Sequence, residues 1–280
     1  MEEKKNLKIG IALGGGGVCG FAHIGFLQVL EENGIKPDII SGVSMGAIIG
    51  AFYASGYTLD EIEEKVKSIK KSDLFKLNAF RILKEGLISG KKIEKFLEKN
   101  LKVKNIEECN IPFYAGATDL KTGRSHYFDK GDIVQALRAS TAIPGVFPAV
   151  NANGTSYVDG GTSENVPFKI LRSKGADVVI ACDCINLYKK EEVKTSMISA
   201  LVSSVEILQY ISNCSNLKLN RDKVDVYCID STEGVTPQTI DLKLIPKVIE
   251  SGRQCALKHL DQIKKMIEKK EKVLENTCVL

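Results

Sequence analysis

Short apolar runs alternate with amphipathic stretches over the first 55 residues of the chain. Residues 7–13 form one apolar run, a glycine-rich loop follows it, and residues 21–32 then carry apolar side chains at helical spacing. A second apolar run ends at Val43, and residues 47–55 again have helical character. Two successive strand-loop-helix units predict a mainly parallel α/β sheet with helices on both faces.

The alternation continues through the rest of the chain. Residues 58–100 are rich in Lys and Glu, and Thr58 with Glu61 forms the capping-box pattern that starts a helix. We interpret this segment as a solvated outer helix, with a lid that covers the site as the alternative. Further strands are expected at 111–119, 125–128, 176–182 and 224–229 and at the approach to Asp159, and further helices at 133–140, 169–174, 197–211 and 245–280.

Composition and charge argue against several classes of function. Of the 280 residues, 44% are hydrophobic and 26% are charged, which is ordinary for a globular protein. The net charge is only +4, Trp is missing and 6% of residues are aromatic, so we expect no nucleic-acid binding. No apolar run reaches the roughly 18 residues of a membrane-spanning helix. The charged start, residues 1–8, shows no secretory signal, so a cytoplasmic protein is expected.

The eight cysteines follow no disulfide or metal-site spacing. In a protein without an export signal we expect reduced thiols, several of them buried as small hydrophobic side chains. Cys182 and Cys184 lack a second pair at zinc spacing, so no metal site is predicted. Cys278 is third from the end, whereas a prenylation box needs its cysteine fourth from the end.

The most informative stretch is Gly42-Val43-Ser44-Met45-Gly46, which follows an apolar run and precedes small and apolar residues. This order is typical of a nucleophile elbow, in which a strand ends, the backbone turns sharply and a helix begins. The two glycines permit backbone to pack against backbone around the turn. The serine hydroxyl would then be exposed beside a helix N-terminus. In the alternative interpretation, Ser44 only caps the helix.

A second candidate is the glycine-rich loop that follows residues 7–13. Backbone N–H groups between a strand and a helix N-terminus form a nest for an anionic oxygen. Gly15, Gly17 and Gly20 also fit the G-x-G-x-x-G fingerprint of dinucleotide-binding folds. That fold needs an acidic residue at the end of the second strand, where this chain has Ser44. We therefore favour an oxyanion hole.

A base for Ser44 is the third requirement, and histidine is the usual choice. None of the three histidines occupies a clear loop after a strand in the second half, where an α/β-hydrolase carries its base. We interpret each of them as a surface or packing residue. They are His23, His126 and His259.

Asp159 is the better candidate for the base. It precedes Gly160 and Gly161 at a strand end, where a carboxylate can approach a neighbouring loop closely. An exposed aspartate with a pKa near 3.9 is a feeble base. Burial must raise its pKa, or proton transfer must accompany the attack, for a Ser-Asp dyad to work. In the alternative interpretation, Asp159 only forms a turn.

These segments, in this order and on these elements, resemble the patatin-like phospholipases. The similarity is greatest to the bacterial branch that resembles the neuropathy-target-esterase domain. The matching motifs are the glycine-rich loop, the elbow and the triplet Asp159-Gly160-Gly161. Further matching stretches are 21–25, 86–91, 138–148 and 175–180, and the likeness is strongest up to about residue 172.

The resemblance implies a three-layer α/β/α patatin-like fold with a mainly parallel central sheet. No repeat, low-complexity tract or linker divides the chain, so we expect a single domain over residues 1–280. The resemblance puts a patatin-like catalytic core at 7–172. Residues 173–280 then supply strands and helices that complete the same domain.

The resemblance also implies a serine lipid-acyl hydrolase with a Ser-Asp dyad and no histidine or calcium. Ser44 matches the family's nucleophile and Asp159 its base. The amides of the matching loop, Gly15, Gly16 and Gly17, form the oxyanion hole. No cofactor or metal is expected, and the partner is a lipid or ester substrate with transient membrane-surface contact. The remaining motif glycines are Gly20, Gly42, Gly46, Gly160 and Gly161.

One position departs from the family pattern. Two residues after the last loop glycine the family usually has Arg or Lys, whereas this chain has Cys19. The backbone donors remain, and in serine hydrolases each contributes about 3–4 kcal/mol, so we expect an active but slow enzyme. The alternatives are an acyltransferase with the same dyad and a degenerate regulatory module. Val43 argues against a malonyl-transferase-like site, which carries His there.

Overall fold

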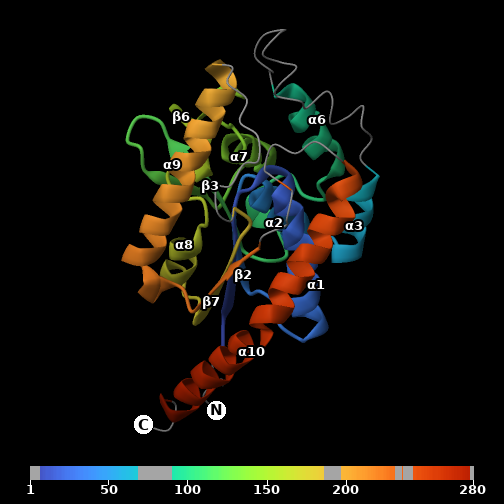
Figure 1. Ribbon diagram of the computed structural model, residues 1–280, viewed down its shortest axis with the longest axis vertical. Helices are drawn as coiled ribbons and strands as arrows, with labels where there is room; N and C mark the ends of the chain where they lie inside the picture. The colour runs from blue at the N-terminus through green and yellow to red at the C-terminus, as the bar shows by residue number, and fades with distance from the viewer. Residues whose placement is uncertain (1–6, 69–89, 186–196, 231–234, 236–241, 278–280) are drawn as a thin grey trace.

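The computed structural model describes residues 7–68, 90–185, 197–230, 235 and 242–277 of the chain. A central sheet lies between two layers of helices, which confirms the predicted three-layer α/β/α arrangement (Figure 1). Residues 69–89 of the lysine-rich segment lie outside the described residues, and so does most of the matching stretch 86–91.

The sheet has the strand order β5-β6-β3-β2-β1-β7-β8, and β4 pairs with β3 beside this path. Neighbours from β3 to β8 are parallel, whereas β4 and β6 pair with β3, and β5 with β6, in antiparallel fashion. The predicted mainly parallel sheet is confirmed. The strands are β1 Ile9–Leu13, β2 Ile39–Val43, β3 Phe113–Asp119, β4 Ser125–Phe128, β5 Val150–Ala152, β6 Thr155–Asp159, β7 Val178–Asp183 and β8 Val226–Ile229.

Most helices lie close to the predicted ranges, but the segment 58–100, which was interpreted as one outer helix, contains two separate helices among its described residues, α3 (Leu59–Lys67) and α6 (Lys91–Asn100). Among the described residues, none has the length and apolar character needed to cross a membrane. The α-helices are α1 Ala22–Glu32, α2 Met45–Ala54, α3 Leu59–Lys67, α6 Lys91–Asn100, α7 Ile133–Ser140, α8 Phe168–Ser173, α9 Met197–Leu219 and α10 Ile245–Thr277. Short 3₁₀ turns are η1 Gly17–Phe21, η2 Ile106–Glu108, η3 Gly160–Thr162, η4 Arg221–Lys223 and η5 Leu242–Leu244.

Two helical predictions are resolved in detail. The capping box that starts α3 is confirmed, because Thr58 accepts from the Glu61 amide and Glu61 accepts from the Thr58 amide. Helix α9 continues to residue 219 rather than ending at 211 as predicted. The apolar pattern fades after 211, but Asn213 and Asn216 donate hydrogen bonds from α9 to Asp183 and to the backbone after η3, and so the helix continues.

Alternate residues of the strands point into two cores on opposite faces of the sheet. In β1, Ile11 and Leu13 belong to the larger core, which α1, α2, α7 and α10 complete. Ala12 belongs to the smaller core, to which α8 contributes Phe168 and Leu171. This period of two is the geometry of a strand that is buried on both faces.

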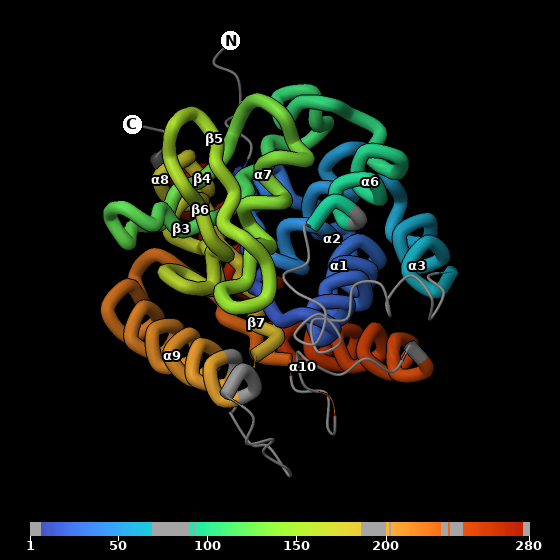
Figure 2. Tube along the Cα trace, turned by 90° about the horizontal axis from the view of Figure 1, so that it is seen from above, coloured from blue at the N-terminus to red at the C-terminus, as the bar shows by residue number. Residues whose placement is uncertain are grey.

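Helices α1 and α10 cross in close contact, and glycines make the crossing possible. A Cβ atom on Gly25 would lie 1.9 Å from the Ile249 carbonyl oxygen, and one on Gly252 would lie 1.8 Å from that of Ala22. Helix α10, near the end of the chain, therefore packs directly on the first helix, as Figure 2 also shows. Since α1 directly follows the glycine-rich loop, this contact helps to fix the position of the loop.

Candidate active site

Ser44 lies on the sharp turn between β2 and α2, as the elbow motif predicts. Its backbone has φ 54°, a positive value that residues with a side chain rarely adopt. A Cβ atom on Gly42 would lie 2.5 Å from the Gly46 carbonyl oxygen, and one on Gly46 would lie 2.3 Å from that of Leu13. Both flanking glycines are thus required by backbone contacts around the turn.

The Ser44 amide is held by a residue that sequence analysis did not single out. Its N–H donates to the hydroxyl oxygen of Ser140, at the end of α7, over 2.9 Å. Ser140 is fully buried. The bond satisfies a buried amide at the turn, and it also removes the Ser44 amide from the possible oxyanion donors. Ser140 lies in the matching stretch 138–148, but nothing in that stretch indicates which residue its hydroxyl contacts.

The glycine-rich loop passes directly against Ser44, since a Cβ atom on Gly15 would lie 3.3 Å from the Ser44 Cβ. The Gly15 amide is not a free donor, however, because it donates to the Asn165 carbonyl over 3.1 Å. This corrects the expectation that all three loop glycines supply donors. The amides of Gly16 and Gly17 have no acceptor within the described part of the chain, and they remain the candidate oxyanion donors.

The motif glycine at position 20 has a packing role. A Cβ atom on Gly20 would lie 2.6 Å from the side chain of Met45, the first residue of α2. The end of the glycine-rich loop therefore touches the start of the helix behind Ser44. This contact fixes the loop and the elbow relative to each other.

Asp159 ends β6 and is 3% exposed. Its Oδ1 accepts from the Gly161 amide over 2.8 Å, whereas its Oδ2 has no partner among the described residues. Burial raises the pKa of this carboxyl to about 6, although the Gly161 amide and the neighbouring Ser44 hydroxyl each lower it. The structure thus brings the Ser44 hydroxyl beside a carboxyl suited to accept a proton near neutral pH.

The residues after Asp159 join its turn to the glycine-rich loop. A Cβ atom on Gly160 would lie 2.5 Å from the Gly116 carbonyl oxygen, and one on Gly161 would lie 2.9 Å from Oδ1 of Asn165. The side-chain Nδ2 of Asn165 also donates to the carbonyl of Gly15 over 3.3 Å. Asn165 therefore contacts both the glycine-rich loop and the turn after Asp159, and nothing in its sequence context predicted this.

In the described structure, none of the three histidines is hydrogen-bonded to the Ser44 hydroxyl. His23 donates from Nε2 to the Gly14 carbonyl over 2.7 Å, and burial lowers its pKa to about 4, so it is neutral. It holds the glycine-rich loop, in agreement with its interpretation as a packing residue. His126 makes an edge-to-face contact with Phe128 in β4, and the His259 ring bonds to the Cys255 carbonyl within α10.

The seven cysteines among the described residues form no disulfide, and five of them are buried. Cys182, Cys184 and His23 place potential metal-ligand atoms within 4.8 Å of one another. His23 Nε2 is already bonded to the Gly14 carbonyl, and a structural zinc site takes four ligands. The trio is better explained as packing beneath the glycine-rich loop. Burial raises the pKa of Cys184 to about 12, so its thiol stays protonated.

Cys19 replaces the cation that the family usually has near the loop. It is 5% exposed, and burial raises the pKa of its thiol to about 12. A neutral thiol supplies no positive charge to an oxyanion or phosphate. Any oxyanion stabilisation from this loop must therefore come from its backbone amides.

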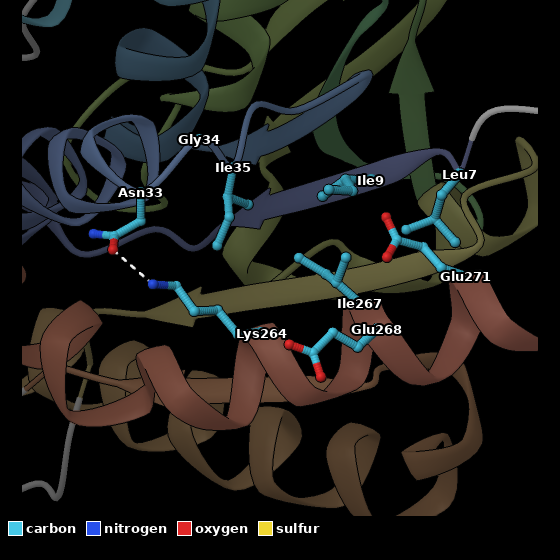
Figure 3. A pocket seen from close by; sticks show the side chains of 9 residues that line it. All are labelled: Leu7, Ile9, Asn33, Gly34, Ile35, Lys264, Ile267, Glu268 and Glu271. Carbon is cyan, nitrogen blue, oxygen red and sulfur yellow. Dashed lines mark hydrogen bonds between the residues drawn. The ribbon is translucent and has the colours of Figure 1, made fainter.

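A separate pocket of about 430 Å³ lies at the other end of β1 (Figure 3). Leu7 and Ile9 line it together with Lys264 and Ile267 of α10, and Lys264 donates a hydrogen bond to Asn33 over 2.8 Å. Because Ser44 follows the carboxyl end of β2, which is parallel to β1, the pocket lies at the opposite, amino-terminal end of these strands. It does not belong to the candidate active site.

Comparisons with known proteins show which family and fold the chain is similar to. The family model described as patatin-like phospholipase matches residues 11–172, more than half of the chain. An uncharacterised NTE family protein of Mycobacterium tuberculosis is 37% identical over 174 residues, which cover 62% of this chain and 48% of the relative. Lysophospholipase NTE1 of Saccharomyces cerevisiae is 30% identical over 178 residues, which cover 62% of this chain and 11% of the relative.

The solved structure of VipD from Legionella pneumophila is similar in fold. Its TM-score is 0.53 at 15% identity, and the match covers 92% of this chain and 67% of that chain. The match to the mycobacterial relative spans about half of that protein's length, and the match to the yeast relative spans about a tenth.

Proposed function

Because the chain belongs to the patatin-like phospholipase family, we propose that it is a serine lipid-acyl hydrolase. In this proposal Ser44 is the nucleophile and Asp159 the base in the cleavage of carboxylic esters. The observation that carries the proposal is the position of the Ser44 hydroxyl beside a buried carboxyl whose pKa is raised to about 6. The amides of Gly16 and Gly17, which have no acceptor among the described residues, support a role for the glycine-rich loop in binding an oxyanion.

In the first half-reaction the Ser44 oxygen attacks the ester carbonyl carbon while Asp159 accepts the hydroxyl proton. The carbonyl oxygen becomes an oxyanion, which the amides of Gly16 and Gly17 stabilise. The carbon–oxygen bond to the alcohol then breaks, and Asp159 returns its proton to the leaving alkoxide. The products are a free alcohol and an acyl-Ser44 ester.

In the second half-reaction a water molecule attacks the acyl-Ser44 carbonyl, and Asp159 accepts one of its protons. The same amides hold the second oxyanion. Collapse of this intermediate breaks the bond to the Ser44 oxygen, which recovers the proton from Asp159. A carboxylic acid is released, and the enzyme returns to its starting state without a cofactor.

The substrate class in this proposal is a phospholipid, lysophospholipid or related lipid ester. The name lysophospholipase, given to the yeast relative, supports this class. The segment from Ala142 to Phe147 is the candidate surface for the acyl chain, since the Asp159 amide donates to the Ala142 carbonyl over 2.9 Å. Ala142 and Val146 are buried in it, whereas Phe147 is half-exposed.

The proposal is tested by measuring hydrolysis of p-nitrophenyl butyrate and of lysophosphatidylcholine. Ser44→Ala and Asp159→Asn are each expected to lower kcat/KM at least about a thousandfold, since each removes one member of the dyad. Ser44→Ala should also abolish labelling by a fluorophosphonate probe. Undiminished turnover in either variant would remove that residue from the mechanism.

Ser55→Ala is the matched control for the serine variant. Ser55 is buried at the far end of α2, where its hydroxyl donates to the Phe52 carbonyl over 2.9 Å. Its substitution removes a buried hydroxyl from the same region of the fold without touching the dyad. Turnover and labelling should stay at the level of the unaltered protein.

A further inference from the structure

Helix α9 exposes an apolar stripe to solvent. Half of the ten large hydrophobic residues that the described structure exposes lie on this helix, and their exposed fractions run from 37% to 80%. Exposed positions recur every three or four residues along it, which places them on one face. The five are Leu201, Ile207, Leu208, Ile211 and Leu219.

The opposite face of α9 is mostly polar and faces the protein, although Leu217 packs against the smaller core. Asn213 donates to the buried carboxylate of Asp183, and Asn216 donates to the Ser163 carbonyl just after η3. Gln209 approaches the turn that follows Asp159, since a Cβ atom on Gly161 would lie 2.7 Å from its Nε2. The helix is thus amphipathic in the reverse sense from an ordinary surface helix, which buries its apolar side.

The apolar stripe is continuous with the candidate active site. Leu201 lies against the loop after α7, because a Cβ atom on Gly145 would be 3.0 Å from its Cδ2. That loop begins at Ala142, whose carbonyl accepts from the Asp159 amide. Both views show α9 at the margin of the molecule (Figures 1 and 2). A lipid resting on the stripe would therefore lie next to the loop that carries the catalytic carboxylate.

Charge along α9 also fits a lipid surface. Its single acidic residue, Glu206, is off the stripe and partly buried, while its single basic residue, Lys218, is exposed at the C-terminal end. Arg221 follows in η4 and is exposed too. Neither cation forms an ion pair with a described acidic residue. Arg221 donates from Nη1 to the Val224 carbonyl over 2.6 Å, and its other guanidinium N–H groups carry the charge that a phosphate could contact. Apolar side chains beside cations without an ion-pair partner in the described structure suit the boundary between acyl chains and anionic headgroups.

We propose that the outer face of α9 is the surface by which this protein rests on an anionic lipid bilayer. The exposed leucines and isoleucines enter the headgroup boundary, and Lys218 and Arg221 contact lipid phosphates. The polar face keeps the helix bonded to the loops around Asp159. The proposal rests on the proposed function for its choice of a lipid as the partner.

The test measures cosedimentation of the full chain carrying Ser44→Ala with vesicles, so that binding is independent of turnover. The vesicles contain phosphatidylcholine and phosphatidylglycerol in equal parts. Adding Leu208→Gln and Ile211→Gln should weaken binding about tenfold or more, because two apolar side chains no longer gain from leaving water. Unchanged binding would overturn the proposal.

The matched control is Leu257→Gln, which removes an apolar side chain of 48% exposure from α10. It should leave vesicle binding unchanged, and equal losses in both variants would overturn the assignment to α9. Lys218→Gln with Arg221→Gln should weaken binding to the mixed vesicles but not to pure phosphatidylcholine. Equal effects on both vesicles would overturn the role of the cations.

With Ser44 intact, the variant carrying Leu208→Gln and Ile211→Gln should hydrolyse soluble p-nitrophenyl butyrate at the rate of the unaltered protein. Its hydrolysis of lysophospholipid embedded in the same vesicles should fall by about the factor lost in binding. If Ser44→Ala retained esterase activity, the proposed function would fail while the vesicle result stood. The alternative is that a second copy of the chain covers the stripe. Light scattering in the absence of lipid tests this. If the protein were a dimer that Leu208→Gln and Ile211→Gln dissociate, the stripe would be a dimer interface and the lipid proposal would be overturned.

Discussion

Two buried aspartates at strand ends differ in how well their oxygens are satisfied. Burial raises the pKa of both Asp159 and Asp183 to about 6. Asp183 accepts from the amide of Ile185 and from the side chains of Asn213 and Tyr227. Asp159 accepts from one amide through Oδ1, and its Oδ2 is unpaired among the described residues. Asp159 therefore has a free oxygen that could accept a proton, whereas both oxygens of Asp183 are held by hydrogen bonds.

The first prediction concerns the pH dependence of ester hydrolysis. Asp159 must be ionised to act as a base, so kcat/KM should rise with pH and level off above a pKa of about 6. At pH 5 it should be about a tenth of the plateau value. The measurement is kcat/KM for p-nitrophenyl butyrate from about pH 4.5 to about 8, which covers both sides of this pKa.

Asp183→Asn is the control for this profile. It removes a second carboxyl of similar pKa that has no contact with Ser44 in the described structure, so the acidic limb should keep its midpoint. A midpoint near the ordinary aspartate value, or one that moves in Asp183→Asn, would argue against Asp159 as the base.

Single residues also show where sequence-based inference ends. Ser44 and Asp159 could be nominated because each lies among glycines that a close turn requires. Ser140 and Asn165 could not, because each acts on a residue far away in the chain, 96 and 150 positions distant respectively. The Gly15 amide was assigned as an oxyanion donor from the resemblance of its loop to the family. The sequence did not show that the distant Asn165 carbonyl would accept its hydrogen bond.

At the scale of elements, the contact between α1 and α10 links the end of the chain to the glycine-rich loop. Helix α1 begins just after η1, and His23 within it holds the Gly14 carbonyl. Gly25 and Gly252 allow the two helices to approach until backbone meets backbone. A change at this crossing should therefore affect both stability and the geometry of the glycine-rich loop.

The second prediction is that Gly252→Ala lowers the free energy of unfolding by about 2–3 kcal/mol, because the added methyl overpacks the crossing. It should also lower kcat/KM for soluble esters, since α1 must shift. Urea denaturation and ester hydrolysis provide the two measurements. Gln254→Ala, two positions along at an exposed site of α10, is the control and should change neither quantity. A Gly252→Ala protein of normal stability would show that the crossing is loosely packed.

The helices also show which patterns predict well. Helix α3 has both a capping box and apolar residues on one face, and its start was predicted to the residue. Helix α9 was ended too early because its apolar residues were taken as the only support for the helix. Its stability after 211 comes from asparagines that bond to Asp183 and to the backbone after η3. Hydrophobic periodicity does not detect a helix that is held to the protein by polar side chains.

At the scale of the whole molecule, the sheet contains strands from before and after residue 172. Strand β7 pairs with β1 from Ile9 to Leu13, and β8 extends the sheet beyond it. The family match ends at residue 172, before either strand begins. The mainly parallel character could be predicted from repeated strand-loop-helix units. The spatial order of the strands could not, because it depends on pairings between distant segments.

The third prediction follows from this arrangement and tests our proposal that residues 1–280 form one domain. A fragment that ends at residue 172 would lack β7 and α10, and β1 would become an open edge. We expect the fragment to be insoluble or unfolded by circular dichroism, and not to react with a fluorophosphonate. A folded, reactive fragment would show that the matched segment is a domain by itself.

The Cys182 carbonyl accepts the Gly14 amide over 2.9 Å and so anchors the start of the glycine-rich loop. This acceptor lies outside the segment that the chain shares with its family model. A chimaera that joins residues 1–172 to the rear half of a relative would therefore need a main-chain oxygen at the same register. Where the graft shifts that register by one residue, the loop would lose its tether even though every motif in the front half is intact.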